Sequence, residues 1–144
     1  MKDFSKQTWE DEIHNAVEMS LLLKNMPIVF SKALSYLMKY YRISNEELSE
    51  HSGLSISTIK RLKSHDYEPV TFKTFMSVCI GLKLNYFIST ELLKRAPINL
   101  VFSEKHMLYR SLLSQCHDMT YEEALIFLDC IEQEKNFLEK RLMT

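Results

Sequence analysis

The sequence contains few of the residues that interrupt helices. Its 144 residues include 2 glycines and 3 prolines, and 46% of them are hydrophobic. Apolar and polar residues show little of the alternation that half-buried strands require. A chain with few helix breakers and enough apolar residues for a core favours packed helices. We therefore predict an all-α fold with one compact domain and appendages.

The chain also lacks paired cysteines and long apolar runs. Cys79, Cys116 and Cys130 show no CxxC spacing, and their odd number argues against a disulfide framework and for a reducing compartment. Cys79 and Cys130 fall on apolar helix faces and are expected to fill the core. No apolar run approaches the ~18 residues that cross a bilayer, and the N-terminus does not resemble a signal peptide. We predict a cytoplasmic protein without a membrane partner.

Motifs that carry catalysis or bind cofactors are missing as well. The sequence has no HExxH, no glycine loop that could cradle a phosphate and no GxSxG. Its histidines and cysteines include one adjacent pair, Cys116-His117, and adjacent side chains on a helix point about 100° apart, which does not make a tetrahedral site. We predict no enzymatic activity, no catalytic residue, no metal site, no cofactor and no small-molecule ligand.

Residues 44–62 have the pattern of two short helices joined by a tight turn. Ser44, followed three residues later by Glu47, is a capping box that starts the first helix. Gly53 can adopt a positive φ without steric cost, which suits a sharp turn. Ser55 then caps the second helix. This sequence of signals is typical of a helix-turn-helix.

The second helix of this motif has one inward and one outward face. Ile59 and Leu62 are spaced to face inward, and Leu54 is placed to enter the core between the two helices. The outward positions hold Ile56, Ser57, Lys60 and Arg61. A short helix that presents small, polar and basic side chains fits the major groove of DNA.

Residues from about 29 to 96 resemble the lambda-repressor-like helix-turn-helix family of transcriptional regulators, also called the xenobiotic-response-element (XRE) or Cro/repressor type. The resemblance is carried by Ser44, Asn45-Glu46-Glu47-Leu48-Ser49, Gly53-Leu54-Ser55 and Ser57-Thr58-Ile59, and it continues through Pro69 and the caps Thr71 and Asn85. It implies a five-helix DNA-binding domain over residues 28–96, whose first helix runs from Ile28 to about Tyr41.

The resemblance also implies which side chains contact double-stranded DNA. Base edges would be read by Ile56, Ser57, Lys60 and Arg61. Arginine and lysine donate to guanine, serine donates or accepts, and isoleucine meets a thymine methyl. The alternatives are a solvated charged face for the two cations and an incidental exposed isoleucine.

Phosphate contacts are implied on both sides of the turn. Asn45 matches the phosphate-contacting glutamine of the family, at a helix N-terminus whose N–H groups favour anions. Thr58 and Lys63 are further phosphate candidates.

Some positions depart from the family pattern. Ser49 and Ser52 stand where alanine or a small apolar residue is usual, and Met38 and Lys63 replace the two partners of a common ion pair. The loop at residues 66–68 is acidic where phosphate contacts are frequent. These departures lower the DNA affinity that we expect more than they affect the fold.

Positive charge is concentrated on the segment that carries the motif. Residues 31–96 hold ten basic and six acidic residues, a net charge of +4, whereas residues 1–30 carry −2 and residues 97–144 carry −3. Because electrostatics supplies most non-specific DNA affinity, this asymmetry favours a DNA-binding domain in the middle of the chain.

The segments on either side are predicted to be amphipathic helices. In residues 1–27, Thr8 begins a helix with a stripe of Trp9, Ile13, Val17 and Leu21, for which internal packing is favoured over a partner. Residues 97–144 are predicted to form a helical hairpin, with one helix from Ser103 to about His117 and the longest helix from Thr120 to about Leu142.

The last helix carries a seam close to a heptad pattern. Its dimerisation candidates are Leu128, Ile131, Leu138 and Leu142. Two compatible roles remain open for this seam, namely packing against the preceding helix of the hairpin and contact with a second subunit.

These observations together predict a sequence-specific regulator. We expect a homodimer that places the 56–63 helix of each subunit in successive major grooves and represses by occluding a promoter. The alternative is a protein-interaction adaptor or antitoxin-like accessory protein that uses the same fold and binds its partner through the C-terminal helices.

Overall fold

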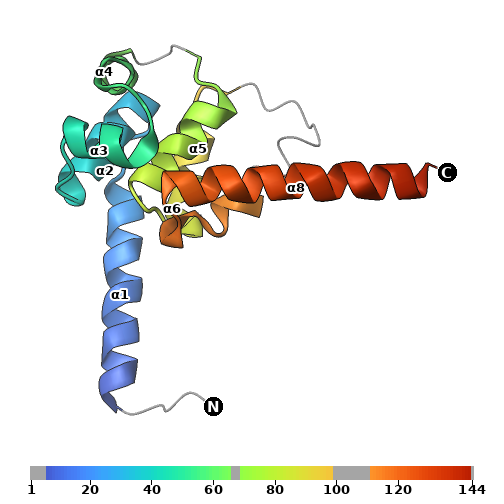
Figure 1. Cartoon of the computed structure of the whole chain (residues 1–144). Helices are drawn as coiled ribbons and strands as arrows, with labels where there is room; N and C mark the ends of the chain where they lie inside the picture. Colours follow the sequence, from blue (N-terminus) through green and yellow to red (C-terminus); the bar gives the residue numbers. More distant parts are fainter. Residues whose placement is uncertain (1–5, 66–68, 99–110, 144) are drawn as a thin grey trace.

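The computed structural model of the chain describes residues 6–65, 69–98 and 111–143. All regular structure in these ranges is helical, which confirms the predicted all-α class. The elements are α1 (Lys6–Asn25), α2 (Phe30–Tyr40), α3 (Asn45–Ser52), α4 (Ile56–Ser64), α5 (Phe72–Gly81), α6 (Tyr86–Arg95), the short 3-10 helix η1 (Cys116–Asp118) and α8 (Tyr121–Leu142) (Figure 1).

Helices α2 to α6 pack around one hydrophobic core. Phe75 lies at its centre and is fully buried, with Leu34 and Leu37 from α2 and Leu48 and Ile59 from the helix-turn-helix. Helix α2 contributes one face to this core, with Ala33, Leu34, Leu37 and Met38 buried. The five-helix arrangement implied by the resemblance is therefore present.

Short polar side chains start the helices where the sequence predicts them. In α3, α4, α5, α6 and α8, the cap residue accepts a hydrogen bond from the backbone N–H three residues on, at 3.0–3.1 Å. The caps are Ser44, Ser55, Thr71, Asn85 and Thr120. Each bond satisfies a donor that the first turn of a helix leaves without an intrahelical partner.

Two predicted helix starts are wrong. Helix α1 begins at Lys6, so Thr8 lies inside the helix and is not its cap. Helix α2 begins at Phe30, with Val29 as a cap that uses no side chain, and Ile28 is exposed. A Thr-x-x-Asp pattern inside a helix looks the same as one at its start. At α2, the first buried side chain, Phe30, marks where the helix begins.

The C-terminal half of α1 is attached to the domain. Leu22 and Met26 are buried in the core, and the Tyr36 hydroxyl donates to the backbone carbonyl of Leu22 at 3.1 Å. The Tyr40 hydroxyl donates to the Glu18 carboxylate, which raises the pKa of Tyr40 to about 12. These contacts fix the end of α1 against α2.

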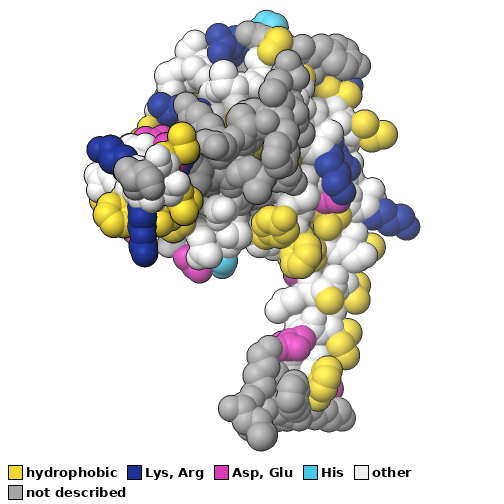
Figure 2. Space-filling view, turned by 90° about the vertical axis from the view of Figure 1, so that its right-hand side faces the viewer, with side chains coloured by type: hydrophobic (Ala, Val, Ile, Leu, Met, Phe, Trp, Pro, Cys, Tyr) yellow, Lys and Arg dark blue, Asp and Glu magenta, His cyan; other side chains and the backbone are white. Residues whose placement is uncertain are grey.

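The N-terminal half of α1 projects away from the domain (Figure 1). The predicted stripe is about half exposed along its length, at 50% for Trp9, 59% for Ile13, 53% for Val17 and 51% for Leu21. Apolar side chains follow one edge of this arm in the space-filling view (Figure 2). The preference for internal packing of this stripe is therefore wrong, because α1 extends beyond the domain and each of these four side chains stays about half exposed.

Helix α8 forms a second arm, which starts against α5 and extends crosswise to α1 (Figure 1). Ala124 is buried at its base, whereas Leu142 near its end is 81% exposed. Of the preceding hairpin helix, residues 111–113 are helical with Leu112 and Leu113 buried, and residues 103–110 lie outside the described residues.

One predicted core residue on α8 is misplaced. Cys79 is fully buried on α5 as expected, but Cys130 is exposed. Cys130 lies on the side of α8 that faces away from the domain, because the apolar residues of this helix occupy more than one face.

Candidate DNA-binding surface

Helices α3 and α4 and the turn between them have the predicted helix-turn-helix geometry. The Ser44 hydroxyl accepts a hydrogen bond from the backbone N–H of Glu47. The Glu47 carboxylate in turn accepts one from the backbone N–H of Ser44, which completes the capping box. Gly53 ends α3 in the left-handed conformation, with φ 74°. The chain can then turn sharply into Ser55 and α4.

The two serines that depart from the family pattern bind the backbone of the turn. The hydroxyl of Ser49 donates to the carbonyl of Leu54 at 2.6 Å, and the N–H of Leu54 donates to the hydroxyl of Ser52 at 3.1 Å. Ser52 is fully buried. These polar groups therefore replace apolar packing with hydrogen bonds that fix Leu54. Sequence reasoning missed this role, although two hydroxyl residues within the last four positions before a turn glycine are a usable signal.

Tyr121, the first residue of α8, covers the turn. A Cβ atom added to Gly53 would lie 2.6 Å from the Cε1 and Cζ atoms of the Tyr121 ring. Gly53 is therefore required both for its positive φ and for the close approach of this ring. The contact joins residues 68 positions apart, and nothing local in the sequence indicates it.

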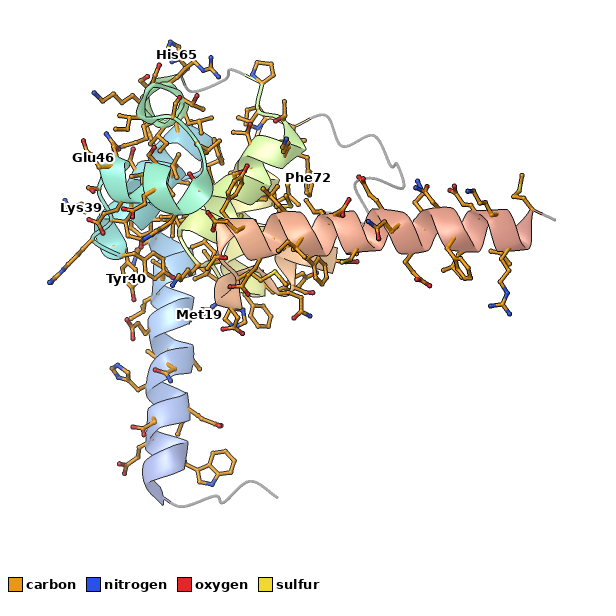
Figure 3. All side chains as sticks on the ribbon, in the orientation of Figure 1. Met19, Lys39, Tyr40, Glu46, His65 and Phe72 are labelled. Carbon is orange, nitrogen blue, oxygen red and sulfur yellow. The ribbon has the colours of Figure 1, made fainter. Side chains whose placement is uncertain are left out.

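Helix α4 presents its outward face at an outer edge of the domain. Ile59 and Leu62 are buried, while Ser57, Lys60 and Arg61 are exposed, as predicted. Side chains project outward from this helix, which ends beside the labelled His65 at the end of the molecule opposite the free tip of α1 (Figure 3). Ile56 is partly buried and so presents less surface than predicted.

Two of the predicted phosphate contacts lie together. The ammonium group of Lys63, near the end of α4, donates to the amide oxygen of Asn45 at the start of α3, at 2.9 Å. Because the oxygen of Asn45 is occupied, its amide NH2 group is oriented as a donor. The third candidate, Thr58, is partly buried, with its hydroxyl oxygen 2.8 Å from that of Ser55.

The charge of this surface is positive on α4 and mixed on α3. Helix α4 contains Lys60, Arg61 and Lys63 and no acidic residue, whereas the first turn of α3 contains Glu46 and Glu47. Glu47 is engaged in the capping box. The positive charge of the helix-turn-helix is therefore carried by α4, and α3 beside it adds no lysine or arginine.

In the described ranges, no group of three or more histidine, cysteine, aspartate or glutamate residues is arranged to hold a metal ion. None of the helices described is both long enough and apolar enough to span a bilayer.

The comparisons with known proteins agree with this geometry. Residues 33–86 match the family model of the Cro/C1-type HTH DNA-binding domain. Searches of curated proteins and of solved structures found no significant match. The segment from α2 to the start of α6 is thus a Cro/C1-type helix-turn-helix domain of the lambda-repressor-like (XRE) family, and the protein is a DNA-binding regulator.

Proposed function

We propose that this protein is a sequence-specific, dimeric transcriptional repressor of the cytoplasm that reads the major groove with α4. The observation that carries the proposal is the outward face of α4, which combines Ser57, Lys60 and Arg61 without any acidic residue. This face lies away from both projecting arms (Figure 3). A duplex can therefore approach it from outside the molecule.

Base recognition is assigned to the side chains of this face. Arg61 and, more weakly, Lys60 donate to O6 and N7 of guanine, and Ser57 donates to or accepts from a neighbouring base. Ile56 contributes a contact with a thymine methyl, which its partial burial makes smaller.

Phosphate binding is assigned to the junction of α3 and α4. Lys63 holds the amide of Asn45 with its NH2 group as a donor, and the first N–H groups of α3 add partial positive charge. Thr58 contributes a weaker contact. These groups would flank the base-reading face and fix the register of α4 on the duplex.

Assembly is assigned to the arms. A dimer would place the two α4 helices one helical turn apart, about 34–36 Å, and would occlude a promoter that overlaps the site. Leu138 and Leu142 are 41% and 81% exposed and remain dimerisation candidates. Leu128 and Ile131 are partly buried, and Leu128 packs against the core of its own chain.

Substitutions on α4 test the proposal against the adaptor alternative. We expect Lys60→Ala and Arg61→Ala to weaken binding to the duplexes that the wild-type protein retains from a random pool. The loss for Arg61→Ala should be about 1–3 kcal/mol if this residue is bidentate to guanine. Lys24→Ala removes an exposed cation from α1 and serves as a matched control that should bind as the wild type does.

The affinities are measured by fluorescence anisotropy at near-physiological salt. Equal losses in all three variants would indicate non-specific charge attraction and contradict a base-reading α4. Unchanged binding in the α4 variants would also contradict it. Failure of the wild-type protein to retain any duplex would support the adaptor, in which the projecting arms bind another protein.

A further inference from the structure

Helix α8 carries a second seam, with an exposed large apolar side chain near each end, that faces away from the domain. Ile126 and Phe137 are 63% and 61% exposed, and Cys130 and Gln133 between them are exposed as well. Their spacing of four, three and four residues is that of a heptad seam, and it places the four side chains within an arc of about 60°. We call these four residues the outer seam.

The outer seam is not needed to hold α8 on the domain. The opposite side of the helix supplies that attachment, with Ala124 buried and Phe127, Leu128 and Ile131 partly buried. Large apolar side chains that a helix exposes in a regular seam, on a face the fold does not use, are typical of an interaction surface.

The outer seam is symmetric about the middle of α8. The helix spans residues 121–142, so its midpoint lies between residues 131 and 132. Cys130 and Gln133 are the second residues on either side of this midpoint, and Ile126 and Phe137 are the sixth. An antiparallel copy of α8 would therefore place Ile126 against Phe137 of the second copy, and Cys130 against Gln133 of the second copy.

The charges beside the seam match the same arrangement. Glu122 and Glu123 flank the seam at the start of α8, and Lys140 and Arg141 flank it at the end. In the antiparallel pair, the acidic end of one helix lies beside the basic end of the other, and the helix dipoles oppose one another. A parallel pair would instead bring like charges together at both ends.

We propose that α8 pairs with α8 of a second copy of this chain, antiparallel, through the outer seam. A helix of this length extends about 33 Å, and two such helices in contact bury on the order of 1,000 Å2, near the lower limit of a specific interface. The interface is isologous, as expected of a twofold dimer. The role of this dimer rests on the proposed function, because it would pair two DNA-binding domains. Its formation can be measured in the absence of DNA.

Cross-linking through the native Cys130 tests the arrangement directly. The twofold axis at the midpoint places the two Cys130 residues about 4.5 Å apart along the helix axis. We expect a short bismaleimide to yield a covalent dimer at low micromolar protein. Cys130→Ser should abolish the product and Cys116→Ser should leave it unchanged. A wild-type protein that stays monomeric on denaturing gels would overturn the proposal.

The oligomeric state of three variants separates this seam from the other candidates. Phe137→Glu should shift the mass measured by light scattering from dimer to monomer. Leu142→Glu alters the seam predicted from sequence and tests it as the alternative interface. Leu125→Glu alters a residue that is 41% exposed outside both seams and is the control, which should stay dimeric. Circular dichroism checks that each variant is folded. Monomers from Leu142→Glu with dimers from Phe137→Glu would overturn the proposal.

These measurements separate the interface from the DNA-binding function. A Phe137→Glu monomer that still binds DNA weakly through α4 supports both proposals. A dimer through the outer seam without DNA binding would leave the interface standing and contradict the repressor.

Discussion

At the residue scale, the turn of the helix-turn-helix depends on contacts of very different range. Gly53, Ser44 and Ser55 act within a few residues of themselves, so their roles could be predicted from the sequence. Ser49 and Ser52 act on the backbone of the turn, and Tyr121 reaches it from the far end of the chain. The roles of Ser49, Ser52 and Tyr121 could not be predicted from the sequence, because each depends on how two segments are arranged in the fold.

Replacement of Gly53 tests this local account. Gly53→Ala adds a Cβ at a positive φ and 2.6 Å from the Tyr121 ring, so we expect a loss of about 2 kcal/mol or more in the free energy of unfolding. In the double variant Gly53→Ala, Tyr121→Ala the clash is absent, and what remains is the backbone strain together with the lost packing of the Tyr121 ring.

Urea unfolding of the four proteins gives the coupling between the two positions. The sum of the two single losses should exceed the loss in the double variant, since part of the Gly53→Ala cost depends on the ring. Strictly additive losses would mean that Tyr121 does not lie on the turn.

At the element scale, local signals located the helices that begin with a side-chain cap better than those that do not. The capped starts of α3, α4, α5, α6 and α8 were predicted, since each depends on a hydroxyl or amide three residues from its partner. The start of α1 was not, because its cap-like residue sits inside the helix. The stripe on α1 was recognised but its burial was not, because periodicity shows an apolar face without showing what covers it.

The joint between α6 and the α1–α2 connection depends on Arg95. Its guanidinium donates to the Pro27 carbonyl at 2.7 Å and to the Glu91 carboxylate at 3.2 Å. Hydrogen bonds from Lys94 and Arg95 lower the pKa of Glu91 from its ordinary value of 4.5. A lowered pKa in the folded state means that ionised Glu91 stabilises the fold at pH values above 4.5 and loses this effect as the pH falls through the folded-state pKa.

Glu91→Gln should therefore be less stable than the wild type at neutral pH and should approach it in acid. The measurement is the urea midpoint of both proteins between pH 7 and pH 3. The difference between them should shrink as the pH falls below 4.5. A difference that is constant over this range, or that grows in acid, would contradict the role of the Glu91 charge.

At the scale of the whole molecule, the two arms and the outward face of α4, which we propose binds DNA, occupy different ends. The α4 face lies away from the tips of α1 and α8, and both arms expose apolar side chains (Figures 1 and 2). The net positive charge of residues 31–96 and the negative charge of both flanking segments follow the same division. Duplex binding and assembly can therefore take place on separate surfaces.

The sequence could predict which side chains of the candidate site are exposed. It could not predict the hydrogen bonds between them. The exposure of Ser57, Lys60 and Arg61 follows from helical periodicity. The hydrogen bond between Lys63 and Asn45 joins residues from two helices and required the fold. The outer seam was missed because the pattern of Leu128 and Ile131, which faces the domain, dominates the apolar periodicity of α8.

The most direct test of the central claim is selection of duplexes from a randomised DNA library by the purified protein at near-physiological salt, followed by sequencing. We expect enrichment of an inverted repeat whose half-sites are centred about 10 base pairs apart, or a multiple of that. This result would identify the operator of a dimeric regulator. Enrichment of no sequence would contradict sequence-specific recognition by α4.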